Sequence, residues 1–139
     1  MTATLRAIYL LILLVWTWLL VKPQPVPESL VGGIPWFDPA MLFFVLAKVT
    51  HFSVYAGFAF LGGWLMPNRR ARFWFGLALI LHGIASEVGQ MVGAAHFDTK
   101  RHGCIRDMLI DAAGVAIGSW LTENALKRWT KPAANLGIN

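Results

Sequence analysis

Charged residues are scarce in this chain. Asp, Glu, Lys and Arg make up 14% of its 139 residues, whereas hydrophobic residues make up 57%. Soluble domains carry about 25% charged residues, so this composition excludes an ordinary soluble domain and favours an integral membrane protein. The length is that of one domain, 1–139. The seven tryptophans fit a membrane protein, because Trp is enriched at membrane interfaces.

Cysteine is nearly absent as well. The single residue, Cys104, excludes an intrachain disulfide. The formal net charge of +5 could indicate nucleic-acid binding in a soluble protein. Here, however, the basic residues lie between apolar runs, and no groove-like pattern of aromatic and basic residues occurs. We therefore expect no nucleic-acid partner, and we interpret the basic residues as cytoplasmic loops.

Proline is concentrated in one place. Five of the seven prolines lie within 22–39, together with a Gly-Gly pair, and they predict a loop. Apolar segments separated by this loop and by polar stretches at 67–72 and 93–103 are long enough to cross a membrane. The sequence therefore predicts an all-α integral membrane bundle of four transmembrane helices, at about 5–21, 40–66, 73–92 and 104–125. The first segment could be a signal peptide, but no small-x-small cleavage site precedes Lys22, so we expect a retained helix.

The basic residues that flank the apolar runs are unevenly distributed. With four spans, seven of them fall on one side and three on the other. The larger group is Arg6, Arg69, Arg70, Arg72, Lys127, Arg128 and Lys131, and the smaller is Lys22, Lys100 and Arg101. The positive-inside rule then predicts that both termini are cytoplasmic and that the two longer loops lie outside.

Polar side chains interrupt three of the predicted spans. They are Lys48, His51 and Tyr55 in the second span, Glu87 and Gln90 in the third, and Asp107 and Asp111 in the fourth. At about 1.5 Å per residue, the ionisable ones fall in the outer half of the bilayer, which predicts one polar pocket open to the exterior. Charges within a membrane usually face the bundle interior and pair. We therefore expect Lys48 to pair with Glu87 or Asp111.

The fourth segment adds two expectations. Asp107 should pair with Arg101 or Arg106, which lie near it in the chain. Small residues on the polar helical stripes should allow close approach of the helix backbones. These small residues are Gly76, Gly83, Gly114 and Gly118.

Three segments carry a pattern that is specific when they are taken together. They are Lys48-x-x-His51-Phe52-x-x-Tyr55, Ser86-Glu87-x-x-Gln90 and Arg101-x5-Asp107-x3-Asp111-x2-Gly114-x3-Gly118, within about 40–120. Over this region the chain resembles the VanZ-like family of small bacterial membrane proteins. The resemblance implies a multi-pass protein of the bacterial cytoplasmic membrane with a role in the cell envelope. The founding member is associated with resistance to the glycopeptide teicoplanin.

The chain departs from that family pattern at two positions. Ala47 stands where an acid usually precedes the lysine, which puts the pairing of Lys48 in question. Asp111 stands where Asn is usual, and its additional negative charge favours a contact between Lys48 and Asp111.

Two functions fit the polar residues. In the first, they form a site that binds a membrane lipid with a polar or phosphorylated headgroup, and the site could also modify that headgroup chemically. The resemblance implies that this lipid is a cell-wall precursor. The proton-transferring residues would be His51, Glu87 and Asp107, the anion-binding residues Lys48 and Arg101, and the further ligand contacts Tyr55, Gln90 and Asp111. In the alternative, the chain is a non-enzymatic accessory scaffold whose polar network only fixes helix packing. No broken helix or inverted repeat supports a transporter.

Other chemistries are less well supported by the sequence. A metal site needs three or four converging ligands, and the spacing shows only pairs within each helix, so we assign no metal ligands and name no cofactor. Ligation by His51, Glu87 and Asp107 is the open alternative. Cys104 beside basic residues could be a reactive thiol, but a lone Cys at a helix start more often fills space. The Trp-rich first span should anchor the chain at the interface rather than line a site.

Overall fold

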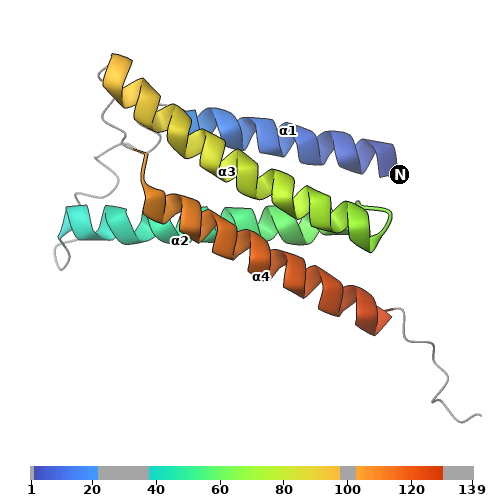
Figure 1. Ribbon diagram of the computed structural model, residues 1–139. Helices are drawn as coiled ribbons and strands as arrows, with labels where there is room; N and C mark the ends of the chain where they lie inside the picture. The colour runs from blue at the N-terminus through green and yellow to red at the C-terminus, as the bar shows by residue number, and fades with distance from the viewer. Residues whose placement is uncertain (1, 22–37, 98–102, 130–139) are drawn as a thin grey trace, which may run out of the picture.

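The computed structural model describes residues 2–21, 38–97 and 103–129, and these ranges contain four α-helices and no strand (Figure 1). The helices are α1 (Thr2–Val21), α2 (Pro39–Trp64), α3 (Arg69–Phe97) and α4 (Ile105–Trp129). The all-α class expected from the sequence is confirmed. The predicted loop at 22–37 and the residues 98–102, which include Arg101, lie outside the described residues.

Successive helices run in opposite directions, so α1 and α3 share one direction and α2 and α4 share the other (Figure 1). At the end that we call the turn end, the turn between α2 and α3 lies beside the start of α1 and the end of α4. There Arg6 donates from Nη2 to Leu65 O at 3.1 Å, and the ring centroids of Trp64 and Trp129 are 6.0 Å apart. The opposite end, where α3 ends and α4 begins, is the site end.

A side-chain cap determines where α3 begins. Asn68 accepts a hydrogen bond at Oδ1 from the Ala71 amide at 2.8 Å, and its carbonyl accepts one from the Arg72 amide at 3.0 Å. Asn is a favoured residue at this position because its side chain satisfies an amide that the helix itself leaves unpaired. As a result, residues 69–72, which we expected in a loop, are helical. At its other end α3 continues through 93–97, which we also expected in a loop.

The distribution of apolar and polar side chains is the reverse of that in a soluble protein. Large apolar residues face outward: Leu14 is 66% exposed, and Phe73 and Leu109 are each 67% exposed. The buried residues include Glu87 and Asp111, each 1% exposed. Three segments, Ala3–Leu20, Met41–Trp64 and Arg69–His96, are long and apolar enough to cross a membrane, as expected for a membrane protein. α4 is not among them.

The parallel helices α2 and α4 pack with their backbones in close contact. A Cβ atom at Gly114 would lie 2.5 Å from Phe52 O, and one at Gly118 would overlap Ala56 O. Below these glycines, Thr122 donates from Oγ1 to Phe60 O at 3.0 Å. The prediction that glycines bring the polar helices together is confirmed at these two positions.

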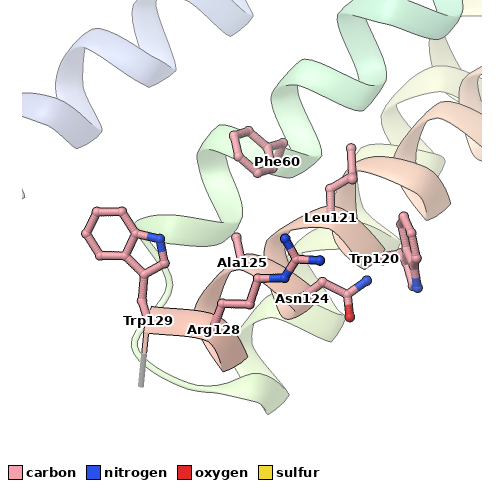
Figure 2. Close-up of a pocket in the computed structure, with 7 residues that line it drawn as sticks. All are labelled: Phe60, Trp120, Leu121, Asn124, Ala125, Arg128 and Trp129. Carbon is pink, nitrogen blue, oxygen red and sulfur yellow. The ribbon is translucent and has the colours of Figure 1, made fainter. Parts of the chain in front are cut away.

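At the turn end, a surface hollow lies between α2 and α4 (Figure 2). Phe60 of α2 faces Trp120, Leu121 and Trp129 of α4 across it, and Arg128 provides its one charged side chain. No carboxylate or imidazole of the described residues lines this hollow.

Candidate functional site

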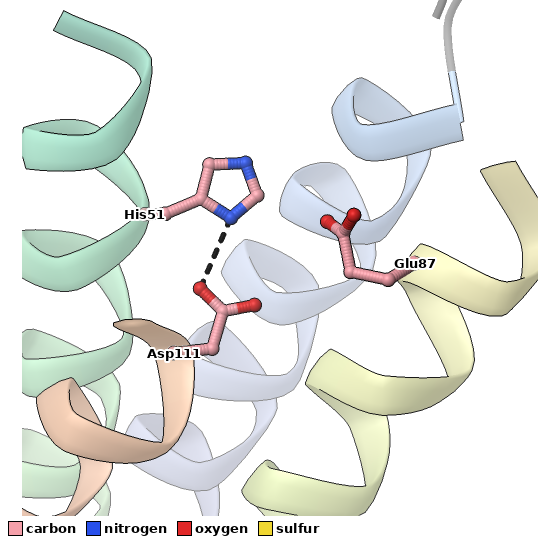
Figure 3. A group of neighbouring side chains, drawn as sticks. All are labelled: His51, Glu87 and Asp111. Atoms are coloured by element: carbon pink, nitrogen blue, oxygen red, sulfur yellow. Dashed lines mark hydrogen bonds and ion pairs between the residues drawn. The ribbon is translucent and has the colours of Figure 1, made fainter. Parts of the chain in front are cut away.

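Three ionisable side chains from three different helices meet inside the bundle. His51 on α2 contacts Asp111 on α4, with Nδ1 and Oδ1 3.0 Å apart, and Glu87 extends from α3 toward this pair (Figure 3). All three are buried, and one potential ligand atom from each lies within 4.8 Å of the other two. The sequence predicted that these residues share one polar pocket, but the spacing within each helix did not predict that these three ligand atoms meet.

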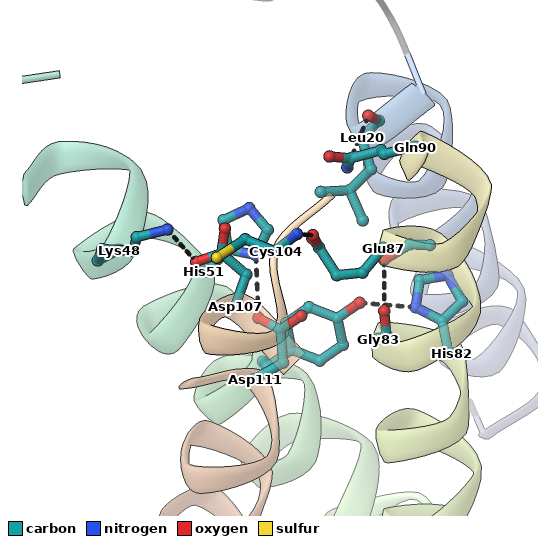
Figure 4. A network of polar contacts seen from close by, with 12 residues as sticks. Leu20, Lys48, His51, His82, Gly83, Glu87, Gln90, Cys104, Asp107 and Asp111 are labelled. Atoms are coloured by element: carbon teal, nitrogen blue, oxygen red, sulfur yellow. Dashed lines mark hydrogen bonds and ion pairs between the residues drawn. The ribbon is translucent and has the colours of Figure 1, made fainter. Parts of the chain in front are cut away.

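A second contact between α2 and α4 lies one turn nearer the site end. Lys48 forms an ion pair with Asp107 through Nζ and Oδ1 (Figure 4). The Lys48 ammonium also lies 4.9 Å from the centroid of the Phe44 ring. The Lys48 and Asp107 side chains are 19% and 13% exposed, so this layer is more accessible than the one below it.

The partner of Lys48 differs from our expectation of Glu87 or Asp111. Because α2 and α4 are parallel, a step of one turn along both helices leads from the Lys48–Asp107 pair to the His51–Asp111 pair. This register leaves Asp111 too deep for the lysine. The expected pairing of Asp107 with an arginine is also wrong for Arg106, which faces outward, and Arg101 lies outside the described residues.

Glu87 connects α3 to the start of α4. Its Oε2 accepts a hydrogen bond from the Cys104 amide at 2.8 Å (Figure 4). The Cys104 carbonyl in turn accepts the Asp107 amide at 2.9 Å as α4 begins. The other oxygen, Glu87 Oε1, is buried without a hydrogen-bond partner among the described residues, and so is Asp111 Oδ2. The two unpaired oxygens belong to the three-helix group of Figure 3.

Below this group, a hydrogen-bonded chain joins α1, α2 and α3. Thr17 donates its hydroxyl proton to Leu13 O at 2.8 Å, so it can only accept from His82 Nε2, which is also 2.8 Å away. In the neutral ring, His82 Nδ1 then accepts the Tyr55 hydroxyl at 2.9 Å. Both nitrogens of this ring therefore have a hydrogen-bond partner, and the Tyr55 hydroxyl bonds to His82 below the three-helix group.

α1 also contributes an aromatic wall that the sequence did not predict. Trp16 packs edge-on against His51, with ring centroids 6.1 Å apart, and is half-buried. The sequence did not predict this contact between Trp16 and His51, and Trp18 is 60% exposed. Thr17 and Tyr9 inside this apolar run were the available signal that one face of α1 packs against other helices, since buried hydroxyls need hydrogen-bond partners.

The expected site residues thus divide into three groups. Those that converge at the site end are Lys48, His51, Glu87, Asp107 and Asp111. Tyr55 lies in the layer below, and Gln90 turns away to donate from Nε2 to Leu20 O of α1 at 3.1 Å (Figure 4). Gln90 therefore fixes α1 against α3 and does not contact the converging group.

Comparison with known proteins adds nothing to this geometry: no family model, no curated protein and no solved structure matches the chain. The resemblance to the VanZ-like family stays a prediction.

Proposed function

We propose that this chain is a four-span membrane protein of the bacterial cell envelope whose outward-facing polar group binds a phosphorylated lipid headgroup. The observation that carries the proposal is the convergence, at one end of an apolar bundle, of five ionisable side chains from three helices. Polar interactions between membrane helices contribute only about 0.6 kcal/mol each on average. Stability alone is therefore a weak reason to retain so many of them.

The character of α4 supports a fourth span. Its 25 residues extend about 37 Å, more than the roughly 30 Å hydrocarbon core. Its acids Asp107 and Asp111 are buried in the bundle, whereas Ile105, Leu109 and Trp120 face outward at 61% exposure or more. The mean hydropathy of α4 is thus lowered in part by acidic groups that would not contact lipid.

The charge at the turn end supports the orientation. The basic residues of the described ranges that lie there are Arg6, Arg69, Arg70, Arg72, Lys127 and Arg128. By the positive-inside rule this end is cytoplasmic, and the site end faces outward.

Single cysteines introduced into a Cys104→Ala chain test this topology in intact bacterial cells. We expect a membrane-impermeant maleimide to label Asp38→Cys at the site end directly. Pro67→Cys and Trp129→Cys at the turn end should react only after the cells are permeabilised. Labelling of Trp129→Cys alone without permeabilisation would show that α4 does not cross the membrane. Labelling of both Pro67→Cys and Trp129→Cys would show that the orientation is the reverse of the one proposed.

Lys48 is the group best placed to contact an anion from outside. It lies in the more accessible layer, and its partner Asp107 can be exchanged for a phosphate oxygen, which accepts the same charged hydrogen bond. α2 is about 39 Å long and extends beyond the hydrocarbon core, so a headgroup can lie beside its first turns.

Native mass spectrometry with two lipids that differ only in the phosphate tests headgroup binding. Short-chain phosphatidic acid should bind the full chain at least about tenfold more tightly than the matching diacylglycerol, because a charged hydrogen bond contributes about 1.5–3 kcal/mol. The double variant Lys48→Met/Asp107→Asn removes the pair without leaving a lone charge, and it should lose this preference. Arg128→Gln, at the turn end, is the matched control and should keep it.

One observation favours the scaffold alternative. The Lys48–Asp107 pair and the Gln90–Leu20 hydrogen bond each join two different helices, as a purely structural network would. Wild-type protein without any preference for the phosphorylated lipid would support the scaffold. A folded double variant that also loses an envelope phenotype, such as glycopeptide tolerance, would support the site.

A further inference from the structure

We propose that His51, Glu87 and Asp111 bind one divalent transition-metal ion. The three ligand atoms come from three helices and lie within 4.8 Å of one another. His51 Nδ1 and Asp111 Oδ1 are 3.0 Å apart, which is about the separation of neighbouring ligands that each lie 2.1 Å from an octahedral metal. A small movement of the Glu87 side chain completes the set.

The unpaired oxygens point to a missing positive partner. Glu87 Oε1 and Asp111 Oδ2 are buried without a hydrogen bond from any described residue, although both side chains are 99% buried. Buried carboxylates are normally paired or coordinate a metal. At the site end, Lys48 is the only lysine or arginine of the described ranges that forms an ion pair, and its partner is Asp107. Even with His51 protonated against Asp111, the two carboxylates keep one negative charge that no described lysine or arginine compensates, and a divalent cation supplies the missing positive charge.

The donor set indicates the class of ion. One imidazole and two carboxylates suit Zn²⁺ or Mn²⁺ better than Ca²⁺ or Mg²⁺, which prefer oxygen ligands alone. Three protein ligands leave coordination positions open for water or a ligand. Lys48 and Asp107 occupy the more accessible layer one turn above, on the side from which an ion would enter. The proposal depends on this geometry and not on the headgroup function.

The test uses the tag-free full chain in detergent, stripped of metal and titrated with Zn²⁺ alone by calorimetry. We expect one ion per chain. Glu87→Gln and Asp111→Asn should each weaken binding by at least about 100-fold, since changes beyond the direct ligands already reduce affinity 10- to 100-fold. Glu123→Gln, an acid of α4 at the turn end, is the matched control and should bind like wild type. Wild-type protein that binds no ion, or variants that all bind equally, would overturn the proposal.

A second measurement covers the case in which the carboxylate variants do not fold. Mn²⁺ added to the wild-type chain should give an electron spin-echo signal with the nitrogen coupling of a bound imidazole. His51→Gln should abolish this coupling, while Glu123→Gln should retain it. A bound Mn²⁺ without imidazole coupling in the wild-type chain would exclude His51 as a ligand and overturn the site as proposed.

Discussion

Replacing Gly118 with leucine is expected to prevent α4 from packing against α2. The first added carbon would overlap Ala56 O and lie 2.9 Å from the Ala59 side chain, and neither backbone can move without shifting its whole helix. Gly118→Ala should destabilise the bundle by about 1–3 kcal/mol, the usual effect of overpacking. Gly118→Leu should leave no monodisperse protein. Unfolding in mixed micelles and gel filtration measure the two outcomes.

Two other glycines provide matched controls. Gly57 on α2 and Gly89 on α3 have nothing within 4 Å of an added Cβ. Alanine at either position should therefore leave stability unchanged or raise it by up to about 1 kcal/mol, because Ala favours a helix more than Gly does. If Gly118→Ala unfolds at the same detergent fraction as Gly57→Ala, the close contact between α2 and α4 does not exist in solution.

Much of this fold could be predicted from the sequence, because the responsible signals are local. Long apolar runs and proline-rich or basic breaks determine where helices form. The four-residue spacing of Asp107 and Asp111 places both acids on one face wherever that helix packs. The need to pair charges in an apolar environment then predicts that Lys48, His51 and Glu87 face the same interior.

The individual partners could not be predicted, because they depend on the register between helices. Moving α4 by one turn, about 5.4 Å, would exchange Asp107 for Asp111 opposite Lys48, and no local signal distinguishes the two registers. The close approach at Gly114 and Gly118 determines the register, and it emerges only when α2 and α4 are packed together.

The sequence predicted one polar pocket that includes His51, Glu87 and Asp111, but it did not predict that these three residues bring their ligand atoms together. The ligand atoms of His51, Glu87 and Asp111 are brought together by packing alone, so residue spacing within one helix says nothing about them. The contribution of α1 was missed differently. Trp16 and Thr17 lie in a uniformly apolar run, which predicts a membrane helix but not which of its faces is buried. Only the packed structure shows which face contacts His51 and His82.

Lys48→Met should be among the most destabilising single changes at the site end. It leaves Asp107 charged inside the bundle, and removing one partner of a buried ion pair costs about 3–5 kcal/mol. Asp107→Asn should have a similar effect, because it leaves the ammonium unpaired. The double variant should recover to within about 1 kcal/mol of wild type, since neutral side chains of similar size replace a buried pair at little cost. Unfolding of all four proteins in mixed micelles gives the coupling energy.

The ion pair between Arg72 and Glu123 at the turn end is the matched control for this cycle. Its Nε–Oε1 distance is 2.6 Å, and the Arg72 and Glu123 side chains are 18% and 28% exposed, but the pair lies where we expect the solvated membrane surface. The Arg72→Met/Glu123→Gln cycle should therefore give a coupling of only about 0.2–1 kcal/mol, as for exposed pairs. Equal couplings in the two cycles would mean that Lys48 and Asp107 are solvated like a surface pair. The site end would then lie outside the hydrocarbon core. This result would contradict the placement of the ionisable side chains in the outer half of the bilayer, on which the polar pocket depends.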